Sequence, residues 1–153
     1  MSSKKERSPM SLQKIFDTAG VGMLKQGMRS MSNGRKDCRY RGTRGCKCAV
    51  GFLIPDDLYD RGIEGASVWG QRSSTSQKWE EQKKLKEVLE VLGMDTKEHL
   101  DLLERLQDVH DGETETNKQK LRSCWHQRLH VVAAEFSLST HSIDKVMKEM
   151  SEG

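Results

Sequence analysis

At 153 residues the chain has the length of one domain, with enough side chains for a core that needs no covalent staples. Hydrophobic residues make up 34% of it, charged residues 32% and aromatic residues 5%, so we expect a small core of Leu, Val, Ile and Met. A net charge of +3 argues against a strongly basic nucleic-acid coat protein, and no apolar run approaches the roughly 20 residues of a membrane span.

Residues 1–10 are charged and lack the apolar core of a signal peptide, so we predict a flexible basic tail and a cytoplasmic location. In that compartment the four cysteines stay reduced. Ser11 then caps a predicted helix that runs to the Asn33-Gly34 turn, with an apolar stripe of Leu12, Ile15, Phe16, Ala19, Met23 and Met31. Three glycines weaken this helix unless another element packs closely against them: Gly20, Gly22 and Gly27.

Residues 38–60, CRYRGTRGCKCAVGFLIPDDLYD, are the most unusual stretch of the chain, with three of its four cysteines and both of its tyrosines. Cys38–Arg41 and Cys46–Val50 flank two glycines, which predicts a short hairpin. Ala49–Ile54 is too short for an independent helix and is broken at Pro55, so we expect a buried turn of helix or the end of a strand.

A long loop over residues 60–76 follows, rich in Gly and Ser, with its middle pinned by Val68 and Trp69. Apolar periodicity then predicts helices with starting signals at Ser74-x-x-Gln77, Asp95-x-x-Glu98, Thr116-x-x-Gln119 and Ser139. We expect the first three of these helices to end near Gly93, Asp111-Gly112 and Phe136. The predicted fold class is mainly α, a compact domain of four to five helices over residues 11–153, with a small Cys-rich β-hairpin or loop insert.

Several motifs carry a family resemblance: Cys38-Arg-Tyr-Arg-Gly, Lys47-Cys-Ala-Val-Gly, Leu53-Ile-Pro-Asp, Tyr59 and Leu106-Gln-Asp-Val-His-Asp. With these motifs the chain resembles a family of small bacteriophage and prophage proteins over most of residues 11–136. It departs from that pattern at Cys46 and in an extended C-terminal helix. The resemblance implies a phage source, and hence a location in the host cytoplasm or the virion, but it supplies no mechanism.

A cationic surface is the first candidate site, because residues 29–47 contain seven Lys or Arg and a single acid, Asp37. Arg and Tyr combine hydrogen-bonding groups with flat area, which suits protein acids or phosphates. We therefore predict contacts with a host or phage protein, with nucleic acid as an alternative partner, through Arg39, Tyr40, Arg41, Arg44 and Lys47, with Trp69 as an anchor. The alternative reading is that these side chains only wrap and cap the hairpin.

The cysteines suggest two further hypotheses. Cys38, Cys46 and Cys48 could be zinc ligands, with His110 or Cys124 as the fourth, although the spacing is poor for a zinc knuckle. Cys48 could also be a nucleophile with His110-Asp111 as its base. Inert core thiols and a hydrogen-bonded core histidine are the competing interpretations.

An acidic cluster could hold a divalent ion, but it lacks the ligand spacing of a calcium loop: Asp56, Asp57, Asp60 and Glu64. We prefer an exposed turn there. The sequence also contains no P-loop, no GxGxxG and no HExxH motif.

Residues 129–150 have the apolar pattern and polar turn of a helix-turn-helix. Such a unit would direct four side chains to a major groove: Thr140, His141, Ser142 and Lys145. The second helix is net acidic, however, which suits phosphate poorly. The preferred function is therefore a non-enzymatic phage-type binding protein without a cofactor or membrane partner. A DNA-binding regulator and a cysteine- or zinc-dependent enzyme are the alternatives.

Overall fold

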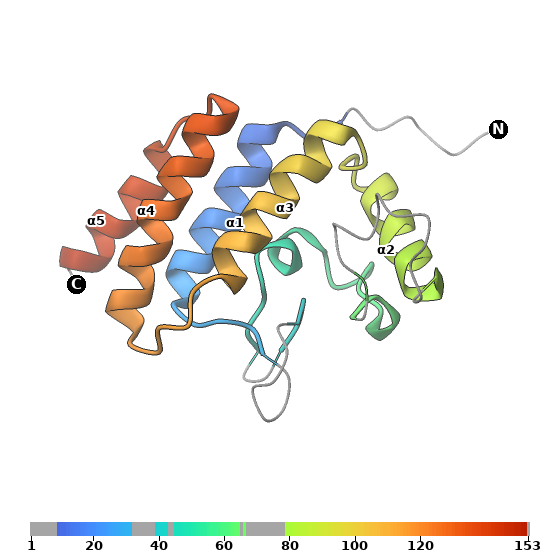
Figure 1. The fold of residues 1–153 in the computed structure, drawn as a ribbon, viewed down its shortest axis with the longest axis horizontal. Helices are drawn as coiled ribbons and strands as arrows, with labels where there is room; N and C mark the ends of the chain where they lie inside the picture. The colour runs from blue at the N-terminus through green and yellow to red at the C-terminus, as the bar shows by residue number, and fades with distance from the viewer. Residues whose placement is uncertain (1–8, 32–38, 43–44, 65, 67–78, 153) are drawn as a thin grey trace.

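The computed structural model describes residues 9–31, 39–42, 45–64, 66 and 79–152 (Figure 1). These residues form a mainly α fold, as the apolar periodicity predicts. Two short 3₁₀ turns, η2 (Val50–Leu53) and η3 (Arg61–Ile63), precede most of the helices. The α-helices are α1 (Leu12–Gln26), α2 (Trp79–Val91), α3 (Lys97–Asp111), α4 (Lys118–Phe136) and α5 (His141–Glu152).

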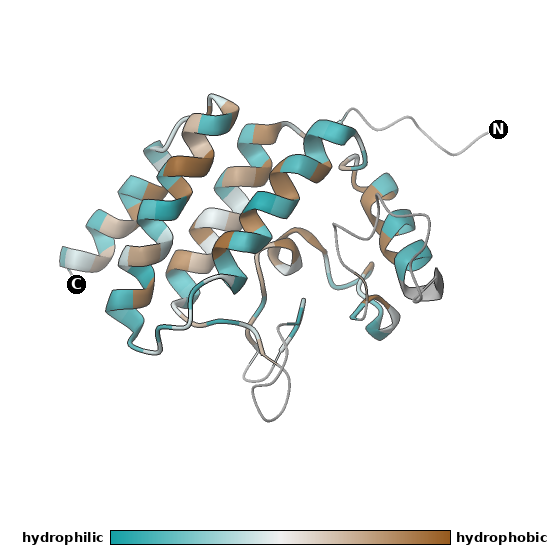
Figure 2. Cartoon of the chain, viewed as in Figure 1, coloured by the Kyte–Doolittle hydropathy of each residue, from teal (hydrophilic) through white to brown (hydrophobic). Residues whose placement is uncertain are grey.

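Helix α1 is the centre of the helical group, because it contacts α3, α4 and α5, while α4 packs on both α3 and α5 (Figure 1). Helix α2 lies at the other end of the molecule, against η3. The helices carry apolar segments beside polar ones (Figure 2), and their buried apolar side chains form one core. None of the helices in the described part of the chain is both long and apolar enough to cross a bilayer.

The first helix is shorter than predicted. Ser11 caps it as expected, since its hydroxyl accepts the backbone N–H of Lys14 at 3.1 Å. The helix then ends at Gln26, because Gly27 adopts the left-handed conformation (φ 63°) and its N–H bonds to the carbonyl of Met23. The predicted extension to the Asn33-Gly34 turn is therefore wrong, and that turn itself lies outside the described residues.

Two of the helical glycines are explained by close packing. A Cβ atom on Gly20 would lie 2.9 Å from Cγ2 of Ile143 on α5, and one on Gly22 would lie 2.6 Å from the ring of Phe52. The expectation that another element packs closely at these glycines is confirmed, and both η2 and α5 depend on it.

The starts of α3 and α4 shift by one residue from the predicted signals. Thr96, rather than Asp95, caps α3, and its partner in the capping box is His99. Nε2 of His99 lies 2.7 Å from the carbonyl oxygen of Met10, a contact across 89 positions that no local motif reveals. In the same way Asn117, rather than Thr116, caps α4, while the Ser74-x-x-Gln77 signal lies outside the described residues.

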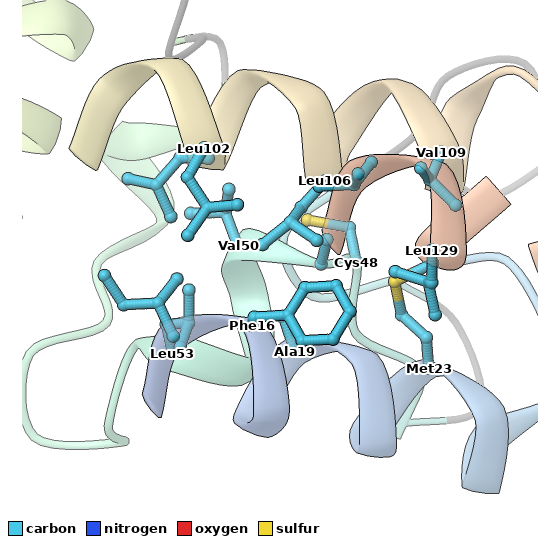
Figure 3. Close-up of a cluster of buried hydrophobic side chains, with 14 of the residues drawn as sticks. Phe16, Ala19, Met23, Cys48, Val50, Leu53, Leu102, Leu106, Val109 and Leu129 are labelled. Atoms are coloured by element: carbon cyan, nitrogen blue, oxygen red, sulfur yellow. The ribbon is translucent and has the colours of Figure 1, made fainter. Parts of the chain in front are cut away.

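The Cys-rich segment enters the core, as the buried turn predicted over Ala49–Ile54 requires. Figure 3 shows Cys48, Val50 and Leu53 between α1 and α3, and η2 packs against both helices. The described part of the predicted hairpin is a single antiparallel bridge between Arg41 and Lys47. The expected buried turn of helix is η2, and the chain reverses again at Pro55, whose carbonyl accepts the N–H of Leu58.

Candidate functional site

Glu64 organises the segment that carries the predicted contact residues. Its carboxylate accepts the backbone N–H of Tyr40 at 2.9 Å and that of Arg41 at 3.2 Å, and it also accepts the hydroxyl of Tyr59. The side chain is only 8% exposed, and Nε of Arg39 lies 3.7 Å from it. Glu64 is therefore part of a polar clamp, not of an ion site.

Burial, together with the hydrogen bond to Glu64, raises the pKa of Tyr59 to about 12. The phenol thus stays protonated at neutral pH and serves as the donor in this clamp. The guanidinium of Arg41 lies over the Tyr59 ring, 4.3 Å from its centroid. It also donates to the carbonyl of Ile54 at 3.1 Å and pairs with Asp56 at 2.7 Å.

Tyr40 is buried, and its hydroxyl donates to the carbonyl of Ala66 at 2.7 Å. Tyr40 was predicted to contact a partner, with wrapping of the hairpin as the alternative, and its burial fits the wrapping role. Lys47 is half-buried, and its backbone N–H and C=O both bond to the side-chain amide of Gln26 at 2.8 Å. Two other predicted contact residues, Arg44 and Trp69, lie outside the described residues.

Side chains alternate between the two faces of this segment. Tyr40, Cys46 and Cys48 are buried, whereas Arg39, Arg41 and Lys47 keep part of their surface in solvent. Arg39 is 37% exposed and Arg41 23%. Because Arg41 and Lys47 are partners in an antiparallel bridge, their side chains share one face. We call Arg39, Arg41 and Lys47 the cationic edge.

Cys48 is placed poorly for nucleophilic chemistry. It is 1% exposed, and burial raises the pKa of its thiol, so that the neutral form dominates. Its sulfur accepts the N–H of Gly51 at 3.4 Å, which anchors the start of η2. These contacts are those of the core thiol that was the competing interpretation.

His110 is fully buried and both of its ring nitrogens are engaged. Nε2 accepts the backbone N–H of Ser30 at 3.0 Å, so Nδ1 carries the proton and donates to Asp111 at 2.7 Å. The ring stacks on Trp125 with 5.5 Å between centroids. His110 therefore has no nitrogen left to activate Cys48 or to bind zinc beside Cys46; the third candidate, Cys38, lies outside the described residues.

The acidic residues near the cationic edge are also engaged separately. Asp56 pairs with Arg41, and Asp60 caps η3 through the N–H of Gly62 at 2.6 Å. Lys84 of α2 lies 3.9 Å from Asp60. These carboxylates are shared among neighbouring cations and amides, as expected for the exposed turn.

Two of the four predicted DNA-reading side chains at the start of α5 are bonded within the protein. Ser142 donates to Asp17 of α1 at 2.6 Å, and Thr140 donates to Asp144 at 2.9 Å. His141 and Lys145 are exposed. Half of the predicted groove contacts are thus used inside the protein.

Sequence reasoning missed one cluster altogether. His126 and His130 of α4 both place Nε2 at 2.7 Å from Oδ1 of Asp144 on α5. Burial opposes ionisation of Asp144, but hydrogen bonds from His126, His130 and Thr140 outweigh it and lower its pKa to about 2. The i,i+4 spacing of the histidines was a signal in the sequence, whereas the position of Asp144 was not.

Comparisons with known proteins add no constraint: no family model, no curated protein and no solved structure matches this chain. The candidate function therefore depends on the geometry of the described residues.

Proposed function

We propose that this chain is a non-enzymatic, phage-type binding protein whose cationic edge engages an acidic segment of a host or phage protein. The observation that carries the proposal is the Glu64 clamp, which fixes the backbone of Tyr40 and Arg41 and leaves the neighbouring guanidinium groups partly in solvent. The phage origin is the part of the proposal that depends on the motif resemblance.

Rigidity supports a binding role. Gln26 fixes the backbone of Lys47, as Glu64 fixes that of Tyr40 and Arg41, so two clamped segments carry the cations on one face. A surface that is already ordered loses less conformational entropy when a partner binds. Guanidinium groups also match carboxylates in a planar, two-point geometry, which favours an acidic peptide as the ligand.

The contacts of Cys48 and His110 also favour a binding function over the cysteine-enzyme alternative. Cys48 is a buried neutral thiol, and the two nitrogens of His110 are bonded to Ser30 and Asp111. A binding function needs neither group to be accessible, whereas the cysteine-enzyme alternative needs both.

The test is binding of the full chain to an immobilised glutamate-rich peptide, followed by capture of partners from host lysate. We expect Arg39→Glu combined with Lys47→Glu to weaken peptide binding at least about tenfold, and added salt to weaken wild-type binding. Arg41→Glu is a poor probe, because Arg41 also holds Asp56, Ile54 and Tyr59 together, so a folding defect would imitate lost binding.

Lys118→Glu combined with Lys120→Glu is the matched control, since these two exposed lysines on α4 undergo the same total charge change on another element. Equal weakening by this control would mean that only net charge matters, which contradicts a defined site. Tighter binding to duplex DNA than to the peptide would instead favour a nucleic-acid partner. Unchanged capture by the variant with Arg39→Glu and Lys47→Glu would place the contact surface elsewhere.

A further inference from the structure

The cluster of His126, His130 and Asp144 joins two helices on the exposed side of the α4–α5 pair. The histidines lie one turn apart on α4, and Asp144 comes from the first turn of α5. One potential ligand atom from each residue lies within 4.8 Å of the other two. Within the described residues this is the one group of three metal-ligating side chains that converge.

We propose that this cluster is a binding site for a divalent transition metal ion of the zinc class. Two imidazole nitrogens and one carboxylate oxygen are donors that zinc prefers. Three protein ligands also match the number found in zinc sites that leave one position to water or to another molecule. The proposal is independent of the cationic edge, because none of these residues belongs to it.

The side chains are already aimed at a common point. Both Nε2 atoms lie 2.7 Å from the same Oδ1, and the two rings meet edge to face, with an angle of 87° and 4.8 Å between centroids. In this state the ring N–H groups occupy the space of the ion. An ion would take the place of these hydrogens, and each neutral ring would then carry its single proton on Nδ1, since imidazole nitrogen binds a metal only through its lone pair.

Only small movements are required. With bonds of about 2.0–2.1 Å, a tetrahedral ion holds its ligands about 3.4 Å apart, so each nitrogen must withdraw from Oδ1 by less than about 1 Å. The side chains of His126, His130 and Asp144 are 26%, 44% and 46% exposed. They therefore have room to rotate, and an ion has access from solvent.

The surrounding residues fix the carboxylate in place. Thr140 donates to Oδ2 of Asp144 at 2.9 Å, leaving Oδ1 to the histidines. Ser142 ties α5 to Asp17 of α1, and Ile143 is fully buried beside it. Asp144 is thus held on a docked helix before any ion arrives, and Thr140 has the position of an outer-shell partner.

The test is a calorimetric titration of zinc into the full chain after removal of metal with a chelator. We expect one ion per chain, a higher Tm in the presence of zinc, and an affinity at least about tenfold lower in Asp144→Asn and in His130→Ala. Asp144→Asn keeps a hydrogen-bond acceptor at the same place, so this variant tests the ligand without removing its packing. Thr140→Val should weaken binding about tenfold, because it loosens the carboxylate.

His141→Ala is the matched control. His141 is an exposed histidine in the first turn of α5, like Asp144, but it lies outside the cluster. Cys124, half-buried on α4, is a competing soft ligand. Cobalt(II) distinguishes binding at the cluster from binding at Cys124, because only thiolate ligation gives a thiolate-to-metal absorption band. The proposal is overturned if wild type binds no zinc, if the cobalt spectrum shows thiolate ligation, or if His141→Ala weakens binding as much as Asp144→Asn does.

Discussion

The α-helical group and the irregular segment 39–66 share one hydrophobic core but are held in place by different interactions. In α1, α3, α4 and α5 the backbone groups pair within each helix, and buried apolar faces decide the packing. In segment 39–66 several backbone groups pair instead with polar side chains, namely Glu64 of the segment itself, Gln26 of α1 and Gln107 of α3.

This difference has an energetic consequence. An exposed polar side chain on a helix can be removed with little effect, because the helix keeps its own hydrogen bonds. A clamp residue such as Glu64 cannot, because its loss leaves buried donors without a partner. Removal of a buried apolar side chain should therefore destabilise the helical group most, whereas removal of a polar clamp side chain should destabilise segment 39–66 most.

The largest effect is expected in the helical region from Phe16→Ala. Phe16 is fully buried on α1 between η2 and the neighbouring helices (Figure 3). Its removal leaves a cavity and should lower the free energy of unfolding by about 3–5 kcal/mol, measured by urea denaturation. Val131→Ala on α4, at 57% exposure, should change it by less than about 0.5 kcal/mol. Similar losses in the two variants would contradict the assigned core.

In segment 39–66 the removal of a polar side chain, Glu64→Ala, should lower the free energy of unfolding strongly. We expect a loss of about 3 kcal/mol, because the N–H groups of Tyr40 and Arg41 and the hydroxyl of Tyr59 lose a charged acceptor. Amide exchange should accelerate in residues 39–41, and iodoacetamide should reach Cys48 faster, since that thiol reacts only when the segment opens.

Exposed Glu87 on α2 provides the control for this change, and Glu87→Ala should leave both rates unaltered. Equal acceleration of exchange throughout α4 and α5 after Glu64→Ala would contradict the comparison, because it would mean that the two regions open together.

Gln26→Ala should have a smaller effect on the same segment. Gln26 supplies two hydrogen bonds to the backbone of Lys47, each at 2.8 Å, so we expect a loss of about 1–2 kcal/mol. Thermal unfolding measures it, with the exposed Gln119 of α4 as the matched Gln→Ala control. No difference between the two variants would show that water replaces the clamp at no cost.

The smallest effect is expected from a helix cap. Thr96→Ala removes the hydroxyl that accepts the N–H of His99 and should cost about 1 kcal/mol. Amide exchange should rise only in the first turn of α3, whereas Thr114→Ala in the following loop should change nothing. A loss as large as that of Glu64→Ala would mean that this cap, too, supports contacts far from its helix.

Each candidate site has one part that was visible in the sequence and one part that depends on distant contacts. The run of cations around residues 39–47 was visible in the sequence, but the inward direction of Tyr40 and the engagement of Arg41 were not. Glu64, which accepts the backbone N–H groups of both residues, follows them by more than 20 positions. Likewise, the spacing of His126 and His130 was readable, whereas Asp144 joins them only because α5 folds back along α1 and α4.

By itself the sequence determined the mainly α fold and the approximate helix ends, because apolar periodicity, caps and glycines act over a few residues. It also predicted that a turn over Ala49–Ile54 would be buried. Tertiary structure alone decided which partners Cys48 and His110 have and which polar groups meet. These outcomes depend on contacts between distant positions, and such contacts leave no periodic trace in the chain.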